Sequence, residues 1–230
     1  MHVKWMVSGL TSAALMVGAM PAAAQQAADG CWVGKIGAGT QIARAVVVLH
    51  RAGTPSTMHV MSRALSSDTL HDVVMRADSV TFAYGVGDRA TTVAAVLGAD
   101  GTLVGGFSRA GTTHPLRMKR VAGTPDPATA LMGYWSGTLT SGGAKVLTTG
   151  LQFRPAPCGQ VYMTLDSPDQ GANDLPVTAV SLVGDSLFFE LEYLDGAFRG
   201  TVSADRTQIA GTWTQSGNAL KLELSKDTTR

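Results

Sequence analysis

The sequence has 230 residues, of which 45% are hydrophobic, 15% charged and 6% aromatic, and its formal net charge is +1. A nearly neutral chain without a basic cluster lacks the positive surface that attracts nucleic acids or anionic membranes. We therefore expect no nucleic-acid partner.

The first 24 residues have the composition of a secretory signal peptide. His2 and Lys4 form a basic start, an apolar run extends over residues 6–20, and three alanines end at Ala24. The run is shorter than the roughly 20 residues that a membrane-spanning helix needs. We predict cleavage after residue 24, a periplasmic or secreted protein, and no integral membrane span after signal removal.

A five-residue pattern then occurs twice, as Gly30-Cys31-Trp32-Val33-Gly34 and as Gly133-Tyr134-Trp135-Ser136-Gly137. Each occurrence opens a series of short alternating segments. We predict two tandem units, residues 25–122 and 132–230. Residues 123–131, which contain Gly123, Pro125 and Pro127, read as a semi-extended linker between them.

In the first unit the pattern predicts eight short strands. These are Trp32–Ile36, Ala43–His50, Thr57–Ala64, His71–Arg76, Val80–Tyr84, Thr91–Leu97, Leu103–Phe107 and His114–Lys119.

In the second unit the alternation is stronger. Leu187, Phe189 and Leu191 share one face of a strand, and residues 220–225 alternate leucines with polar residues. Seven turn signals between residues 141 and 218 divide this unit into eight segments as well. We predict an all-β fold of two antiparallel meanders, each an eight-stranded lipocalin-like barrel, with β-sandwiches as the alternative.

Several stretches of the second unit resemble a known bacterial module. They are Leu165-Asp166-Ser167-Pro168-Asp169-Gln170-Gly171, Phe198-Arg199-Gly200 and Ile209-Ala210-Gly211-Thr212-Trp213-Thr214-Gln215. Over about residues 133–225 the chain is similar to the all-β module that precedes the catalytic domain of many secreted bacterial α/β-hydrolases. The first unit is a diverged version of it. The resemblance implies a hydrolase-associated module, duplicated here and without its hydrolase domain.

The tetrapeptide Gly184-Asp185-Ser186-Leu187 matches the serine motif of a lipase and esterase family. No histidine follows it in the sequence, and Gly-Asp between two alternating segments is an ordinary hairpin turn. Other nucleophile and zinc-enzyme motifs are missing from the sequence. We therefore predict no catalytic residues and no enzymatic activity.

Four histidines, His50, His59, His71 and His114, fall in the first unit. Convergent imidazoles would suit zinc or copper, but scattered surface histidines are the commoner arrangement. We predict no metal site and no cofactor.

The two cysteines, Cys31 and Cys158, fall in different units. In an oxidising compartment they would form a disulfide that cross-links the units. The alternative is two unrelated small apolar residues.

The sequence therefore favours an exported, non-enzymatic binding or interaction module of the cell envelope, with a small molecule or an envelope protein as partner. Bulky side chains suffice to fill the second barrel, whereas the first has smaller and softer ones, so if either unit has a cavity for a small apolar ligand, we predict that it is the first. Its candidate lining residues are Val47, Met61, Val73, Met75 and Met118. The alternative is an accessory unit of, or a remnant from, a secreted serine α/β-hydrolase.

Overall fold

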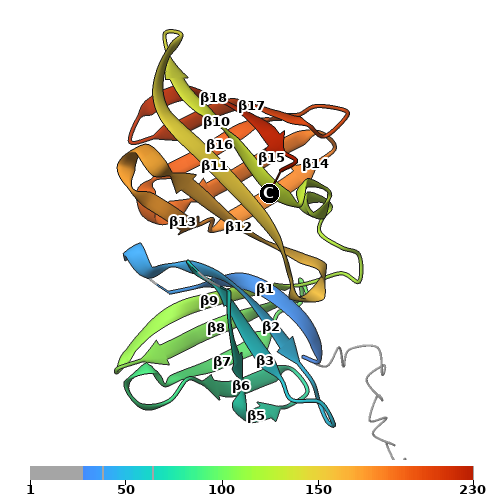
Figure 1. Ribbon diagram of the computed structural model, residues 1–230. Helices are drawn as coiled ribbons and strands as arrows, with labels where there is room; N and C mark the ends of the chain where they lie inside the picture. Colours follow the sequence, from blue (N-terminus) through green and yellow to red (C-terminus); the bar gives the residue numbers. More distant parts are fainter. Residues whose placement is uncertain (1–27, 38, 64, 230) are drawn as a thin grey trace, which may run out of the picture.

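The computed structural model describes residues 28–37, 39–63 and 65–229, and the predicted signal peptide lies outside the described residues. The protein consists of two curled antiparallel sheets, each with nine strands (Figure 1). This confirms the prediction of an all-β chain with two tandem barrel-like units.

The first sheet has the strand order β4-β3-β2-β1-β9-β8-β7-β6-β5. Its strands are β1 (Gly30–Ile36), β2 (Ala43–Leu49), β3 (Thr57–Met61), β4 (Leu65–Thr69), β5 (His71–Met75), β6 (Ser79–Tyr84), β7 (Thr91–Leu97), β8 (Thr102–Arg109) and β9 (Thr112–Arg120). Two 3-10 turns, η2 (Gly39–Gln41) and η3 (Gly87–Arg89), interrupt its loops.

The second sheet repeats this topology in the order β13-β12-β11-β10-β18-β17-β16-β15-β14. Its strands are β10 (Gly133–Ser141), β11 (Ala144–Ala156), β12 (Gln160–Ser167), β13 (Ala172–Pro176), β14 (Ala179–Val183), β15 (Ser186–Leu191), β16 (Gly196–Val202), β17 (Gln208–Gln215) and β18 (Asn218–Asp227). The 3-10 turns near it are η4 (Pro127–Leu131), η5 (Pro157–Gly159), η6 (Pro168–Gln170) and η7 (Glu192–Leu194).

Each barrel is closed by a strand that changes partner halfway along its length. In the first unit, β4 and β5 form the two ends of the hydrogen-bonded order, and Leu70 alone separates them in the chain. The Leu70 N–H donates to the carbonyl of Ser56 at 2.8 Å, whereas the next residue, His71, pairs with Ala83 on β6. The chain itself therefore joins the two edges of the sheet.

The second unit makes the same exchange between two adjacent residues. The Val177 N–H donates to the Met163 carbonyl on β12 at 3.0 Å, and the Thr178 N–H donates to the Glu190 carbonyl on β15 at 2.8 Å. If the two halves of the split strand are counted as one strand, each unit has the predicted eight strands. If they are counted separately, each unit has nine.

The structure differs in detail from the predicted segments at two places. The predicted strand Thr57–Ala64 ends at Met61, and β4, whose five residues are all exposed, was not predicted. Residues 123–131 are only partly a linker, because Ala128 and Leu131 of η4 are fully buried in the second core. Asp126 caps η4 by accepting a hydrogen bond from the Ala128 N–H at 3.0 Å.

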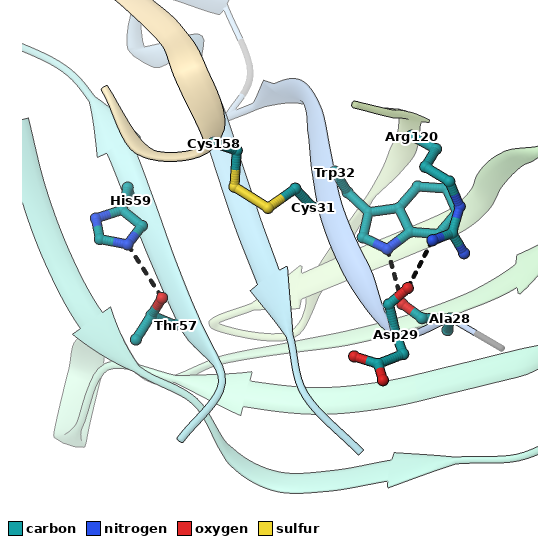
Figure 2. The surroundings of a disulfide bond; sticks show 8 residues. All are labelled: Ala28, Asp29, Cys31, Trp32, Thr57, His59, Arg120 and Cys158. Atoms are coloured by element: carbon teal, nitrogen blue, oxygen red, sulfur yellow. Dashed lines mark hydrogen bonds between the residues drawn. A yellow bond between two sulfur atoms is a disulfide. The ribbon is translucent and has the colours of Figure 1, made fainter. Parts of the chain in front are cut away.

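The two tryptophans of the repeated pattern are core residues with the same environment. Both are 0% exposed. The Trp32 indole N–H donates to the Ala28 carbonyl at 2.8 Å (Figure 2), and the Trp135 indole N–H donates to the Leu131 carbonyl at 2.9 Å. Each indole hydrogen bond thus holds the chain segment that leads into the first strand of its barrel.

A disulfide between Cys31 on β1 and Cys158 on η5 joins the two units (Figure 2). Their Cα atoms are 6.3 Å apart. Of the two alternatives that the sequence left open, the structure shows the cross-link.

Arg44 on β2 adds a buried polar contact at the same junction. Its guanidinium donates to the Val161 carbonyl at 2.6 Å and to the Gln160 side-chain oxygen at 2.8 Å, and it lies 3.4 Å from Asp126. Burial lowers the pKa of Arg44, with the Asp126 carboxylate acting in the opposite direction. The donors of this arginine therefore hold the second unit and the linker against the first.

Tyr162 completes the junction from the side of the second unit. It packs with Val46 and Met61 in an apolar cluster between the units, and its hydroxyl donates to the Ser62 carbonyl at 2.6 Å. Burial raises the pKa of Tyr162 to about 12.

Lys35 on β1 forms ion pairs with Glu190 and Glu192 of the second unit, both at 2.5 Å. The junction combines covalent, apolar and charged contacts.

Candidate functional site

A cavity of about 690 Å³ opens at one end of the first barrel. In an antiparallel meander, alternate connections gather at the same end, and here these are the β1–β2, β3–β4, β6–β7 and β8–β9 connections. The cavity is lined by Ile36, Gly37, Gln41, Ala43, Val60, Ser62, Ser66, Tyr84, Arg89, Thr91, Phe107, Arg109, Ala110, Thr112 and His114. We call this the mouth cavity.

The lining changes from apolar to polar on the way out. Ile36, Ala43 and Phe107 are buried, whereas Arg89 and Arg109 are exposed. Arg109 on β8 lies opposite Thr91 on β7, and Thr91 follows Arg89 by two residues in the chain. Both guanidinium groups therefore belong to the open end of the barrel.

Polar and aromatic groups also line the cavity. The His114 ring stacks on Phe107 with ring centroids 5.1 Å apart. Burial raises the pKa of Tyr84, and its hydrogen bond with Thr91 and the charge of Arg109 partly oppose this rise. The phenol of Tyr84 is consequently neutral at physiological pH, and it can donate or accept a hydrogen bond at the cavity wall.

The corresponding end of the second barrel is nearly filled. The space there measures about 60 Å³ and is lined by Leu139, Leu147, Trp213, Leu222 and other core residues.

The register of the two sheets identifies the side chains that account for this difference. The Ile36–Ala43 pair of the first unit corresponds to the Leu139–Leu147 pair of the second. In the same way, Val93–Phe107 corresponds to Phe198–Trp213. At the positions that line the cavity, the first unit has Ala43 in place of Leu147 and Phe107 in place of Trp213, and these smaller side chains leave the space open.

The rim differs in its chemistry as well as in size. Arg109 takes the place of Gln215, since Arg109 pairs with Thr91 and Gln215 pairs with Gly196. His114, opposite Phe107, takes the place of Leu220, opposite Trp213. The first unit therefore has an arginine and a histidine where the second unit has the uncharged Gln215 and Leu220.

The five residues proposed from the sequence do not line the mouth cavity. Val47 and Met118 are buried in the core of the first unit, and Val73 and Met75 pack against that core from β5. Met61 points the other way, into the apolar cluster between the units. Comparing aligned pairs such as Phe107 with Trp213 is a better guide than choosing small or flexible side chains, because the lining depends on position along the strand.

The histidines lie in separate places. His59 contacts the Thr57 hydroxyl at 3.0 Å (Figure 2), and His71 contacts Asp72 at 3.0 Å on the surface. Within residues 28–37, 39–63 and 65–229, no group of three or more His, Cys, Asp or Glu side chains is arranged to hold a metal ion.

Ser186 is the first residue of β15, and Gly184-Asp185 forms the two-residue turn from β14, with Val183 paired to Ser186. The motif thus occupies a hairpin turn.

Two further hollows lie on outer faces of the first barrel. One, of about 710 Å³, runs along the junction and is lined by Val33, Lys35, Arg44, Val104, Arg117, Val180 and neighbours. Lys35 and Arg44 are already engaged with the second unit, and Arg117 forms an ion pair with Asp100 at 2.5 Å. The other, of about 430 Å³, lies along β6, β7 and β8. Of these three hollows, the mouth cavity is the one that opens into the interior of a barrel, where it reaches the core residues Ile36 and Phe107.

The described part of the chain contains no helix that is long and apolar enough to cross a membrane.

Comparisons with known proteins give little information. No protein-family model matches the chain, and no curated protein matches it. Among solved structures, the chain is similar to a crystal structure of a protein of unknown function from the DUF3598 family of Nostoc punctiforme, with 12% sequence identity and a TM-score of 0.24. The similarity covers 87% of this chain and 96% of that chain. At this identity and TM-score it supports no functional assignment.

Proposed function

We propose that the protein is an exported, non-enzymatic binding module whose first unit holds a small, mainly apolar ligand in the mouth cavity. The observation that carries this proposal is the contrast between the two barrels. The same end of the same fold encloses about 690 Å³ in the first unit and about 60 Å³ in the second.

The size and lining of the mouth cavity suit this role. Ligand sites usually enclose about 300–1,000 Å³, with apolar walls and a few polar groups that fix orientation. A small barrel either fills with side chains or holds one small ligand. In this protein the filled and the hollow versions occur in one chain, so the second unit serves as a structural support for the first.

The disulfide supports the location outside the cytoplasm. Disulfides form and persist in oxidising compartments such as the periplasm. The Cys31–Cys158 cross-link therefore agrees with the signal-like first 24 residues.

Binding can be tested with the whole protein and the neutral probe N-phenyl-1-naphthylamine, whose fluorescence rises in an apolar environment. We expect saturable binding. In the double variant Ala43→Leu, Phe107→Trp, which restores the residues of the second barrel, the signal should fall at least several-fold, because the added atoms occupy the cavity.

The matched control is Ala94→Leu, a similar addition at an exposed position on the outer face of β7. This variant should bind the probe as the unmodified protein does. If the variant Ala43→Leu, Phe107→Trp binds the probe as well as the unmodified protein does, or if only Ala94→Leu loses binding, the site lies elsewhere.

A further inference from the structure

The two arginines at the mouth cavity form no ion pair with another described residue. Among the described residues that line the cavity, none is an aspartate or glutamate. In the described part of the chain, neither Arg89 nor Arg109 forms an ion pair. Asp88, next to Arg89 in the chain, and Asp68, whose charge acts on Tyr84, are both exposed, and among the described residues neither forms an ion pair with these guanidinium groups.

Three basic residues that line the hollow along the junction differ from the rim arginines in this respect. Lys35, Arg44 and Arg117 each have a carboxylate within 4.0 Å. Arg89 and Arg109, with five N–H donors each, both line a cavity that also has apolar lining residues. The neutral Tyr84 and the Thr91 hydroxyl add uncharged hydrogen-bonding groups beside them.

We infer that the ligand of the mouth cavity is an amphiphile with a single anionic head group, such as a carboxylate, and an apolar tail. The tail would lie against Ile36, Ala43 and Phe107, and the head group would be bound at the rim by Arg89 and Arg109. Guanidinium groups bind carboxylates through paired N–H donors, and this geometry favours a planar anion over a hydroxyl group. The inference rests on the proposed function, since it concerns the ligand of the same cavity.

The test compares two competitors that have the same tail and different head groups. Dodecanoate and dodecan-1-ol each displace N-phenyl-1-naphthylamine from the whole protein, and the ratio of their displacing concentrations measures the preference for the anion. In the variant Arg89→Gln, Arg109→Gln this preference should fall about fivefold or more, the effect of losing two exposed charge contacts.

The control is Arg51→Gln, Arg76→Gln. It removes the same charge from exposed positions after β2 and after β5, at the opposite end of the barrel. In the control the preference should be unchanged.

Each outcome is decisive. A preference that falls only in the rim variant supports the inference. An unchanged preference in the rim variant, or an equal fall in the control, overturns it while probe binding still supports the proposed function. If the unmodified protein does not bind the neutral probe at all, the proposed function fails and this inference fails with it.

Discussion

At the scale of single residues, the last glycine of the repeated pattern allows two strands to approach closely. A Cβ atom on Gly34 would lie 2.5 Å from the Arg117 carbonyl oxygen of β9. In the second unit a Cβ on Gly137 would overlap the Glu223 carbonyl oxygen of β18. The first and last strands of each barrel can pair at these positions because no side chain stands between them.

Replacing Gly137 by alanine should therefore destabilise the second unit. We expect a loss of about 1–3 kcal/mol in the free energy of unfolding, the usual cost of forcing atoms into a packed site. Gly123→Ala is the control, because nothing lies within 4 Å of a Cβ at Gly123. Urea unfolding followed by tryptophan fluorescence measures both variants, and equal stability of the two would show that β10 can shift away from β18 at no cost.

The pattern itself was visible in the sequence, but the reason for its last glycine was not. The obstructing carbonyl belongs to a strand more than 80 residues later in the chain. Local propensity carries no information about such a partner, because it depends on the closure of the sheet.

At the scale of elements, the strand that closes each barrel depends on a few polar contacts where it changes partner. In the second unit Thr178 is 1% exposed. Its hydroxyl donates to the Glu190 carbonyl at 3.0 Å and accepts from the Glu192 N–H at 3.0 Å. This side chain thus ties the split strand to the end of β15.

Thr178→Val keeps the shape of the side chain and removes both hydrogen bonds. Because the Glu192 N–H loses its acceptor, we expect a loss of about 1–3 kcal/mol in the free energy of unfolding. The control, Thr149→Val, removes a buried hydroxyl that has no hydrogen-bond partner in the described part of the chain. It should be neutral or stabilising by up to about 1 kcal/mol. If the two valine variants unfold at the same denaturant concentration, the hydroxyl of Thr178 is not important for closure.

Alternation of apolar and polar residues was enough to predict most strands, since one face of such a strand is buried in the core and the other is exposed to solvent. In β18, for example, Leu222 and Leu224 are buried and Lys221, Glu223 and Ser225 are not. The split was missed because the partner changes between two adjacent residues, Val177 and Thr178, with no turn between the two halves of the strand. A change of hydrogen-bonding partner leaves the side-chain period intact, so periodicity cannot detect it.

At the scale of the whole molecule, the two units share one topology but differ in how far one end of the barrel is filled. The second unit has Trp213, Phe198 and Leu147 and is nearly filled, whereas the first has Phe107, Val93 and Ala43 at the same positions and is hollow. Which unit would hold a cavity could be predicted from composition. Which residues line it could not, because lining depends on the register across the barrel, and the softest side chains lie in the core or at the junction.

The disulfide makes the two units act as one body, since it joins residues separated by 127 positions in the chain. In the chain-entropy account, closing a loop of this size stabilises the folded state by about 4–5 kcal/mol. Each unit also has its own core, so the loss of the cross-link need not unfold both units together.

The variant Cys31→Ser, Cys158→Ser should therefore lower the thermal midpoint and separate the unfolding of the two barrels into two calorimetric transitions. In the unmodified protein, a reducing agent should produce the same change, and in the double variant it should have no effect. Peptides from the non-reduced protein should contain the Cys31–Cys158 link by mass spectrometry. Two free thiols in a protein isolated from an oxidising compartment would contradict the cross-link. An unchanged calorimetric profile after reduction would instead show that Arg44, Tyr162 and Lys35 couple the units without the disulfide.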